Sequence, residues 1–158
     1  VEGILAASEK TLAEALKPTV YYNQKTRKLK AFCVFLSERF CGRIEEMGKL
    51  PLLEARSLLL EVSGIGRETA DSILLYALRK PIFVVDAYTW RILVRHGLAG
   101  EDWGYEELRA LFENAFAPDP EFYNEFHALL CHTGAKYCRR KPDCPACPAL
   151  KILGEPIL

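Results

Sequence analysis

The chain has 158 residues, 50% of them apolar, and its 21 basic and 21 acidic residues cancel. This length can bury one sizeable core, and the neutral charge excludes nucleic-acid binding through a global positive field, so such a partner would need local patches or backbone dipoles. The sequence contains no run of 18 apolar residues and no basic segment followed by an apolar one. We therefore expect a cytoplasmic protein without a membrane span or secretory signal.

The spacing of apolar residues predicts an almost entirely helical chain. Ser8 can cap a short helix that Pro18 ends, and a longer helix starts at Asn23 with apolar residues three and four positions apart. Further helices are predicted at residues 51–61, 67–78, 87–96, 105–116 and 121–137. The one β-like segment, Ile82 to Val85, is too short to found a sheet. The sequence therefore predicts an all-α fold.

A glycine-rich turn, Ser-Gly-Ile-Gly at residues 63–66, connects two of these helices. Glycines permit positive φ and the close approach of another backbone, and the first amides of the following helix point outward at its positive dipole end. Such a turn can bind a phosphate without a lysine. Taken alone, a motif this short is more often an ordinary turn between helices.

Four segments, in order, resemble the endonuclease III superfamily of base-excision DNA glycosylases. The matches are YYNQKTRKLKAF to its tyrosine-asparagine-x-lysine loop, VSGIGRETADSILLYAL to its helix-hairpin-helix, VVDAYTWRILVRHG to the segment with its catalytic aspartate, and CRRKPDCPAC to most of its cysteine-rich loop. The resemblance implies an all-α helix-hairpin-helix glycosylase core with a cysteine-rich C-terminal loop. The family's N-terminal helices lack a counterpart, and since the chain begins with Val1, we expect that N-terminal sequence is missing.

The resemblance also implies a domain organisation and a partner. We expect a glycosylase core at residues 1–137, containing the hairpin at 51–78, and a cysteine-rich loop and tail at 138–158. The implied partner is double-stranded DNA with a damaged base, bound by a monomer without a membrane, and associated with the nucleoid in a bacterial or archaeal cell. Lys25, with Arg27 and Lys28, forms a basic strip that follows phosphates or is a solvated helix face. The candidate DNA-contacting residues are Tyr22, Asn23, Lys25, Ser63, Gly64, Ile65, Gly66 and Arg67.

Asp86 is the candidate catalytic residue. Breaking an N-glycosidic bond develops positive charge on the sugar, which a nearby carboxylate stabilises. Asp86 follows an apolar run and can cap the helix that begins at Ala87 while an oxygen stays available at the cleft. A helix cap alone is the simpler explanation without the hairpin; together with the hairpin and the family's order of motifs, catalysis is favoured.

Glu68 marks a departure from the bifunctional members of the family. In those enzymes, the residue two positions after the second hairpin glycine is a lysine that attacks the sugar and forms a Schiff base. Here that position holds Glu68, and the guanidinium of the adjacent Arg67 stays protonated at any working pH. We expect a monofunctional glycosylase that uses water, with Glu68 in a pocket or solvent-ordering role. The alternatives are a bifunctional enzyme that uses another lysine, such as Lys80, and a non-catalytic DNA-binding module.

The same motifs look most like the branch of endonuclease III-type 3-methyladenine DNA glycosylases. That likeness implies alkylated purines as substrates. Their glycosidic bond is already weakened by positive charge, so a modest catalyst suffices.

Cys138, Cys144 and Cys147 have a spacing typical of metal ligands in a chain that we expect in the cytosol. The family's loop holds a [4Fe-4S] cluster with four cysteines, but here the first gap is one residue short and Leu153 occupies the fourth place. Cys131 is a candidate substitute, although a small buried residue is the simpler explanation. An iron-sulfur cluster, zinc and no metal therefore all stay open.

Overall fold

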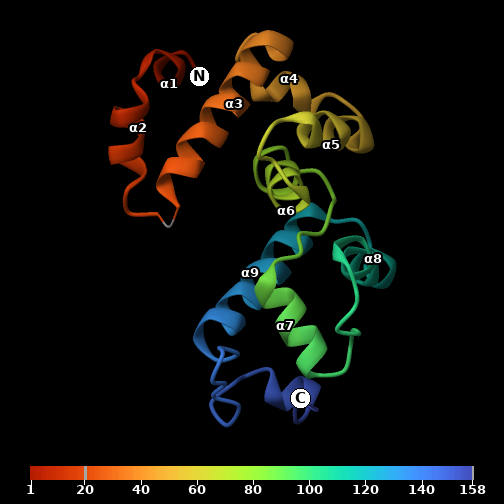
Figure 1. Cartoon of the computed structure of the whole chain (residues 1–158). Coiled ribbons are helices and arrows are strands. Elements are labelled where there is room, and N and C mark those ends of the chain that lie inside the picture. Colours follow the sequence, from red (N-terminus) through yellow and green to blue (C-terminus); the bar gives the residue numbers. More distant parts are fainter. Residues whose placement is uncertain (20, 158) are drawn as a thin grey trace. The chain divides into compact units, whose positions relative to one another are not determined.

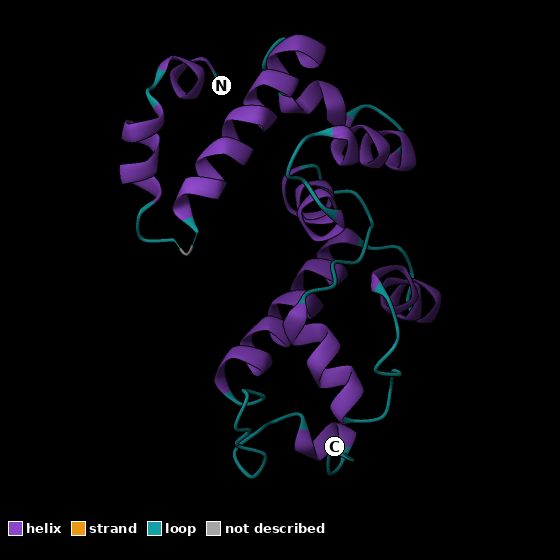
Figure 2. Ribbon diagram, viewed as in Figure 1, coloured by secondary structure: helices purple, strands orange, loops and turns teal. Residues whose placement is uncertain are grey.

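A computed structural model describes residues 1–19 and 21–157, and all regular structure over these residues is helical (Figure 2). This confirms the prediction of an all-α chain. The chain divides into two compact units, Val1–Ala70 and Asp71–Leu158. The sequence predicts a different boundary, after residue 137, between a helical core and a cysteine-rich loop. That boundary stays a prediction. Among the described residues, no helix is both long and apolar enough to span a bilayer.

The first unit is built around one long helix. Its helices are α1 (Glu2–Ala6), α2 (Glu9–Leu16), α3 (Tyr22–Phe40), α4 (Ile44–Gly48) and α5 (Leu52–Glu61). As predicted, Ser8 caps α2, because its side chain accepts a hydrogen bond from the Thr11 amide at 3.1 Å. Helix α2 packs alongside α3 (Figure 1). The core of this unit is apolar, with Cys33, Leu36, Met47, Ala55 and Leu59 all buried.

The second unit carries the C-terminal helices. Helix α6 (Arg67–Ser72) begins in the first unit and runs without a break into η1 (Ile73–Ala77), a turn of π-helix. The remaining helices are α7 (Ala87–Arg95), α8 (Tyr105–Ala115), α9 (Pro120–Lys136) and α10 (Leu150–Leu153). The predicted helices in this part agree with these bounds to within one or two residues.

Helices α7 and α9 cross and pack against each other (Figure 1). The crossing depends on Gly134, where an added Cβ would lie 2.5 Å from the Cβ of Tyr88. Arg91 stacks on the Tyr88 ring and donates hydrogen bonds to the carbonyls of Gly134 and Cys138 at 3.1 and 2.6 Å. A larger residue at position 134 would force α7 away from α9.

The segment from Ile82 to Val85 is extended but pairs with no strand among the described residues. All four of its side chains are buried, between 0% and 4% exposed. The ring of Phe83 stacks on that of Phe112 with centroids 3.9 Å apart, and the Phe83 amide donates to Glu113 Oε1 at 3.0 Å. A side chain thus satisfies a buried backbone amide that a sheet would otherwise satisfy. The segment is fixed in the core and delivers Asp86 to the start of α7.

Candidate functional site

Asp86 is the N-cap of α7, as the sequence predicted. Its Oδ1 accepts hydrogen bonds from the backbone amide of Thr89 at 2.8 Å and from Thr89 Oγ1 at 2.9 Å. Thr89 is itself fully buried, so its hydroxyl has a fixed position. Oδ1 therefore belongs to the helix cap, and Oδ2 contacts other groups.

The neighbours of Asp86 Oδ2 come from α9. The thiol of Cys131 donates to Oδ2 at 3.3 Å, and His127 Nε2 lies 3.9 Å from Oδ2, which is too long for a hydrogen bond. The side chains of Asp86 and His127 are 13% and 9% exposed. His127 and Cys131 are four residues apart, so both project from one face of the helix. Helix packing thus places Asp86 in a sheltered environment, largely out of contact with solvent.

Tyr76 completes this group through a hydrogen bond between its hydroxyl and His127 Nδ1. Burial, followed by electrostatic interactions with Cys131 and Asp86, raises the pKa of Tyr76 to about 12. Burial lowers the pKa of His127 below its usual value, and the charge of Asp86 opposes this only in part. Tyr76 therefore stays protonated at neutral pH, and the direction of its hydrogen bond with Nδ1 follows the imidazole tautomer. At neutral pH His127 is neutral and does not cancel the charge of Asp86.

Asp86, His127 and Cys131 offer a carboxylate, an imidazole and a thiol. Among the described residues, they are the one group of three such side chains whose ligand atoms all lie within 4.8 Å of one another. The sequence predicted Asp86 but did not point to Tyr76 or His127. The spacing of His127 and Cys131 on one predicted helix was the available signal. Its link to Asp86 depends on how α7 packs against α9.

The turn between α5 and α6 has the predicted tight geometry. Gly64 has a φ of +85°, a conformation that L side chains rarely adopt, whereas a Cβ at Gly66 would meet open space. The amide of Ile65 donates to the carbonyl of Val62 at 3.0 Å, and the Ile65 side chain is only 8% exposed. Gly66 begins α6, since its carbonyl accepts from the Ala70 amide. Ile65 therefore anchors the turn, and Ser63, Gly64 and Gly66 form its exposed surface.

Part of the basic strip on α3 reaches this turn. A groove joins α3 to the hairpin, and a Cβ at Gly64 would lie 2.6 Å from Lys28 Cγ. The groove is lined by Gln24, Arg27, Lys28, Ala31, Ser63 and Gly64. The glycine thus leaves the space that the lysine stem occupies. Two cations, Arg27 and Lys28, are placed beside the exposed loop.

The upstream candidates lie elsewhere on the first unit. Tyr22 and Asn23 line a second groove together with Glu9 and Glu14 of α2. Lys25 is exposed on α3 and lines neither groove. The structure therefore associates Arg27 and Lys28 with the hairpin more directly than Tyr22, Asn23 or Lys25.

Arg67 and Glu68 are both exposed in the first turn of α6. Lys80 lies beyond the other end of the continuous α6–η1 helix, where its amide donates to the Leu74 carbonyl at 2.9 Å. The position expected to hold a nucleophilic lysine in bifunctional enzymes is thus occupied by a carboxylate. Lys80 comes 12 residues later in the sequence, after η1.

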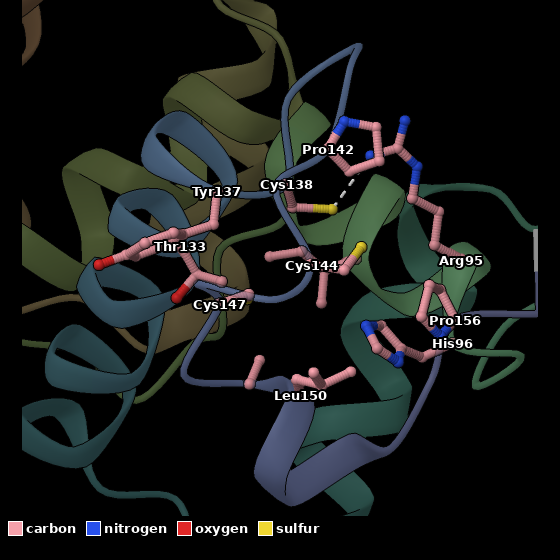
Figure 3. A pocket seen from close by; sticks show the side chains of 12 residues that line it. Arg95, His96, Thr133, Tyr137, Cys138, Pro142, Cys144, Cys147, Leu150 and Pro156 are labelled. Carbon is pink, nitrogen blue, oxygen red and sulfur yellow. Dashed lines mark hydrogen bonds between the residues drawn. The ribbon is translucent and has the colours of Figure 1, made fainter.

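The C-terminal cysteines share one pocket, while Cys131 lies with Asp86 instead. Cys138, Cys144 and Cys147 line the pocket (Figure 3), and the Cys147 amide donates to the Cys144 carbonyl at 3.0 Å. Arg95 Nη1 donates to Cys138 Sγ at 3.2 Å. The short turn brings two of the cysteines close together in the chain, an arrangement typical of metal ligands. These residues fit a metal centre, with a fourth ligand still to be identified.

Known proteins resemble this chain in sequence and in fold. The family described as "HhH-GPD superfamily base excision DNA repair protein" matches residues 1–118. A candidate DNA repair glycosylase of Methanocaldococcus jannaschii is 44% identical over 147 residues, which are 92% of this chain and 66% of that protein. The chain thus spans slightly less than two thirds of that relative.

Two solved structures share the fold. One is an endonuclease III trapped in a covalent intermediate with DNA (TM-score 0.75, 23% identity, 94% of this chain and 65% of that chain). The other is a 3-methyladenine DNA glycosylase of H. pylori bound to 1,N6-ethenoadenine (TM-score 0.73, 28% identity, 85% of this chain and 66% of that chain). The chain therefore belongs to the HhH-GPD superfamily of base excision DNA repair proteins and has the all-helical fold of endonuclease III.

Proposed function

We propose that this chain carries the catalytic part of a DNA glycosylase that hydrolyses the N-glycosidic bond of a damaged base. The observation that carries the proposal is the carboxylate of Asp86, held at the start of α7 with Oδ2 facing Cys131 and His127. Membership of a base-excision repair superfamily supports the same reaction class.

Asp86 acts by charge and position. As the glycosidic bond breaks, positive charge develops on the sugar, and a sheltered carboxylate interacts with it more strongly than one in bulk water. The cap bonds from Thr89 fix the carboxylate before the reaction, so little reorganisation is needed. Since His127 is neutral, it leaves the charge of Asp86 available to the sugar. Water completes the reaction at the sugar carbon.

The hairpin is the proposed DNA contact. Its exposed residues Ser63, Gly64 and Gly66 can approach a phosphate closely, and the N-terminus of α6 favours negative charge. Arg27 and Lys28 supply local positive charge next to the loop in a chain whose net charge is zero. Contacts of this kind hold the DNA backbone without reading its sequence.

We propose that the enzyme lacks lyase activity. A lyase step needs an amine that attacks the sugar and forms a Schiff base, and the position expected to supply it holds Glu68. Borohydride reduces such an imine to a stable bond, so we expect no trapped protein–DNA adduct when the protein is incubated with substrate duplex and borohydride. A trapped adduct would show that another lysine supplies the amine, and Lys80→Ala would then test the nearest one.

The proposed substrate class is alkylated purines. The support is the likeness to the 3-methyladenine glycosylase branch, together with the H. pylori relative, whose structure contains a modified adenine. A panel of duplexes, each with one lesion, tests this: methylated purine, ethenoadenine, uracil and an oxidised pyrimidine. Chromatography of the free base should show release from the alkylated purines. Release from the oxidised pyrimidine alone would overturn the substrate assignment but keep the glycosylase.

We also propose a [4Fe-4S] cluster in the cysteine pocket. The support is the three thiols on its wall and Arg95 beside Cys138. The resemblance of the C-terminal cysteine segment to the family's [4Fe-4S] loop favours a cluster over a single zinc ion. When bound, the cluster would tie the C-terminal loop to the helices around it.

A further inference from the structure

His96 lines the same pocket as the three cysteines. It directly follows α7, as its C-cap, and comes from a part of the sequence remote from the cysteine loop. Figure 3 shows its ring on the side of the pocket near Cys144 and Pro156. The pocket therefore contains a fourth side chain with a metal-binding atom.

The Nδ1 atom of His96 is buried and has no hydrogen-bond partner among the described residues. Buried polar side-chain atoms are nearly always hydrogen-bonded, because a lost partner is not replaced by water. Much of the surrounding wall is apolar, including Ile92, Pro142, Leu150 and Pro156. An imidazole nitrogen left unpartnered in this position has a lone pair that can bind a metal ion.

The backbone holds His96 in place from both sides. Its amide donates to the Ile92 carbonyl at 3.2 Å, and the amide of Ile157 in the C-terminal tail donates to the Arg95 carbonyl at 2.7 Å. Gly97 follows with a φ of +67°, and a Cβ there would lie 2.6 Å from Ile157 Cδ1. The glycine lets the chain leave the helix while the tail packs against the turn. His96 is thus pre-positioned, as a ligand needs to be.

We propose that His96, through Nδ1, is the fourth ligand of the metal centre held by Cys138, Cys144 and Cys147. The proposal rests on the proposed metal centre and identifies the ligand that the cysteine count leaves open. Cys131 does not take this role, because its thiol is bonded to Asp86. A three-cysteine, one-histidine set supplies the four ligands that both iron-sulfur and zinc centres require.

The assignment also connects the metal to the candidate active site. Helix α7 has Asp86 at its first end and His96 at its last. A metal bound to His96 would therefore hold the helix that presents the carboxylate. Loss of the metal would therefore loosen the C-terminal end of α7.

The test compares the natural protein, His96→Ala and His96→Cys, all purified without oxygen. His132→Ala is the matched control, because His132 is an exposed histidine on α9 that does not line the pocket. Iron, sulfide and zinc per chain are measured before and after a chelator. Pulsed EPR of the reduced protein, with and without ¹⁵N-labelled histidine, reports whether a histidine nitrogen is bound to the cluster.

We expect about four iron and four sulfide per chain in the natural protein and a nitrogen coupling that changes with the label. His96→Ala should lower the metal retained after chelation by on the order of tenfold or more. His96→Cys should keep the cluster and lose the nitrogen coupling, and His132→Ala should resemble the natural protein. If His96→Ala does not fold, the spectra of the natural protein and of His96→Cys still show whether His96 is a ligand.

Three outcomes separate this proposal from the proposed cofactor and reaction. A cluster without nitrogen coupling in the natural protein would overturn His96 as a ligand. Zinc that is lost in His96→Ala and kept in His96→Cys would support His96 but overturn the [4Fe-4S] assignment. A natural protein that binds neither iron nor zinc would overturn the metal centre, while base release by the same sample would still test the glycosylase separately.

Discussion

Replacing Asp86 by asparagine separates two roles that the aspartate has in this structure. Asparagine keeps the size of the side chain and an oxygen that can accept the bonds from Thr89. Since Asn and Asp are nearly equal as N-caps, the free energy of unfolding should change by less than about 0.5 kcal/mol. The variant removes the negative charge that the proposed mechanism places beside the sugar.

The expected loss in catalysis is larger than the loss in stability. Removing one preorganised electrostatic contact typically lowers the rate by about a hundredfold, which corresponds to about 2.7 kcal/mol of transition-state stabilisation. The assay is single-turnover release of the base from an alkylated duplex, with urea unfolding of the same samples. Asp86→Ala is the companion variant, since it also removes the cap and should cost about 1 kcal/mol more in stability. If Asp86→Asn releases base at nearly the natural rate, Asp86 is only a helix cap and the mechanism is wrong.

Three further predictions follow from the hairpin, α6 and α9. Gly66→Asp should weaken duplex binding by on the order of tenfold at about 0.1 M salt, whatever the DNA sequence, because it adds negative charge at the proposed phosphate contact. Gly3→Asp is the control, since a Cβ at Gly3 also meets open space. Equal affinities of the two variants would remove the hairpin from the DNA interface. Glu68→Ala should lower base release by a smaller factor than Asp86→Asn, and a larger loss in single-turnover assays would give Glu68 the main charge role. Because the pKa of His127 is lowered in the folded chain, the unfolded chain takes up a proton near pH 6.5 while the folded chain does not. The free energy of unfolding should therefore fall as pH drops below about 6.5. Urea midpoints at several pH values should show a shallower fall in His127→Gln, and identical slopes would contradict the assignment.

Most of the helices could be predicted because their apolar residues repeat over several turns. The exceptions are α1, α4 and α10, which are five, five and four residues long, too short for the apolar spacing to repeat over several turns. The π-turn at Ile73–Ala77 continues a helix, so its apolar residues give no separate signal. Two local features could be predicted as well. Asp86 caps α7 through a residue only three positions away, and Gly64 has the left-handed φ that the glycine motif suggested.

The partners of Asp86 could not be predicted in the same way. Cys131 is 45 residues from Asp86 along the chain, and their hydrogen bond exists because Gly134 lets α7 and α9 cross closely. From spacing alone, Cys131 was grouped with the three C-terminal cysteines. His96 was missed for the opposite reason, because nothing in its sequence neighbourhood indicates a metal. Only the folded chain shows its unpartnered Nδ1 on the wall of the cysteine pocket.

In the proposed mechanism, Asp86 supports hydrolysis by water, and Glu68 stands where a lyase has its lysine. The most direct measurement follows one end-labelled duplex with a single alkylated purine and compares base release with strand breakage, before and after hot alkali. We expect released base and alkali-dependent breaks in equal amounts, with an intact strand before alkali. Strand breaks that accompany base release without alkali, from a preparation free of other nucleases, would contradict it.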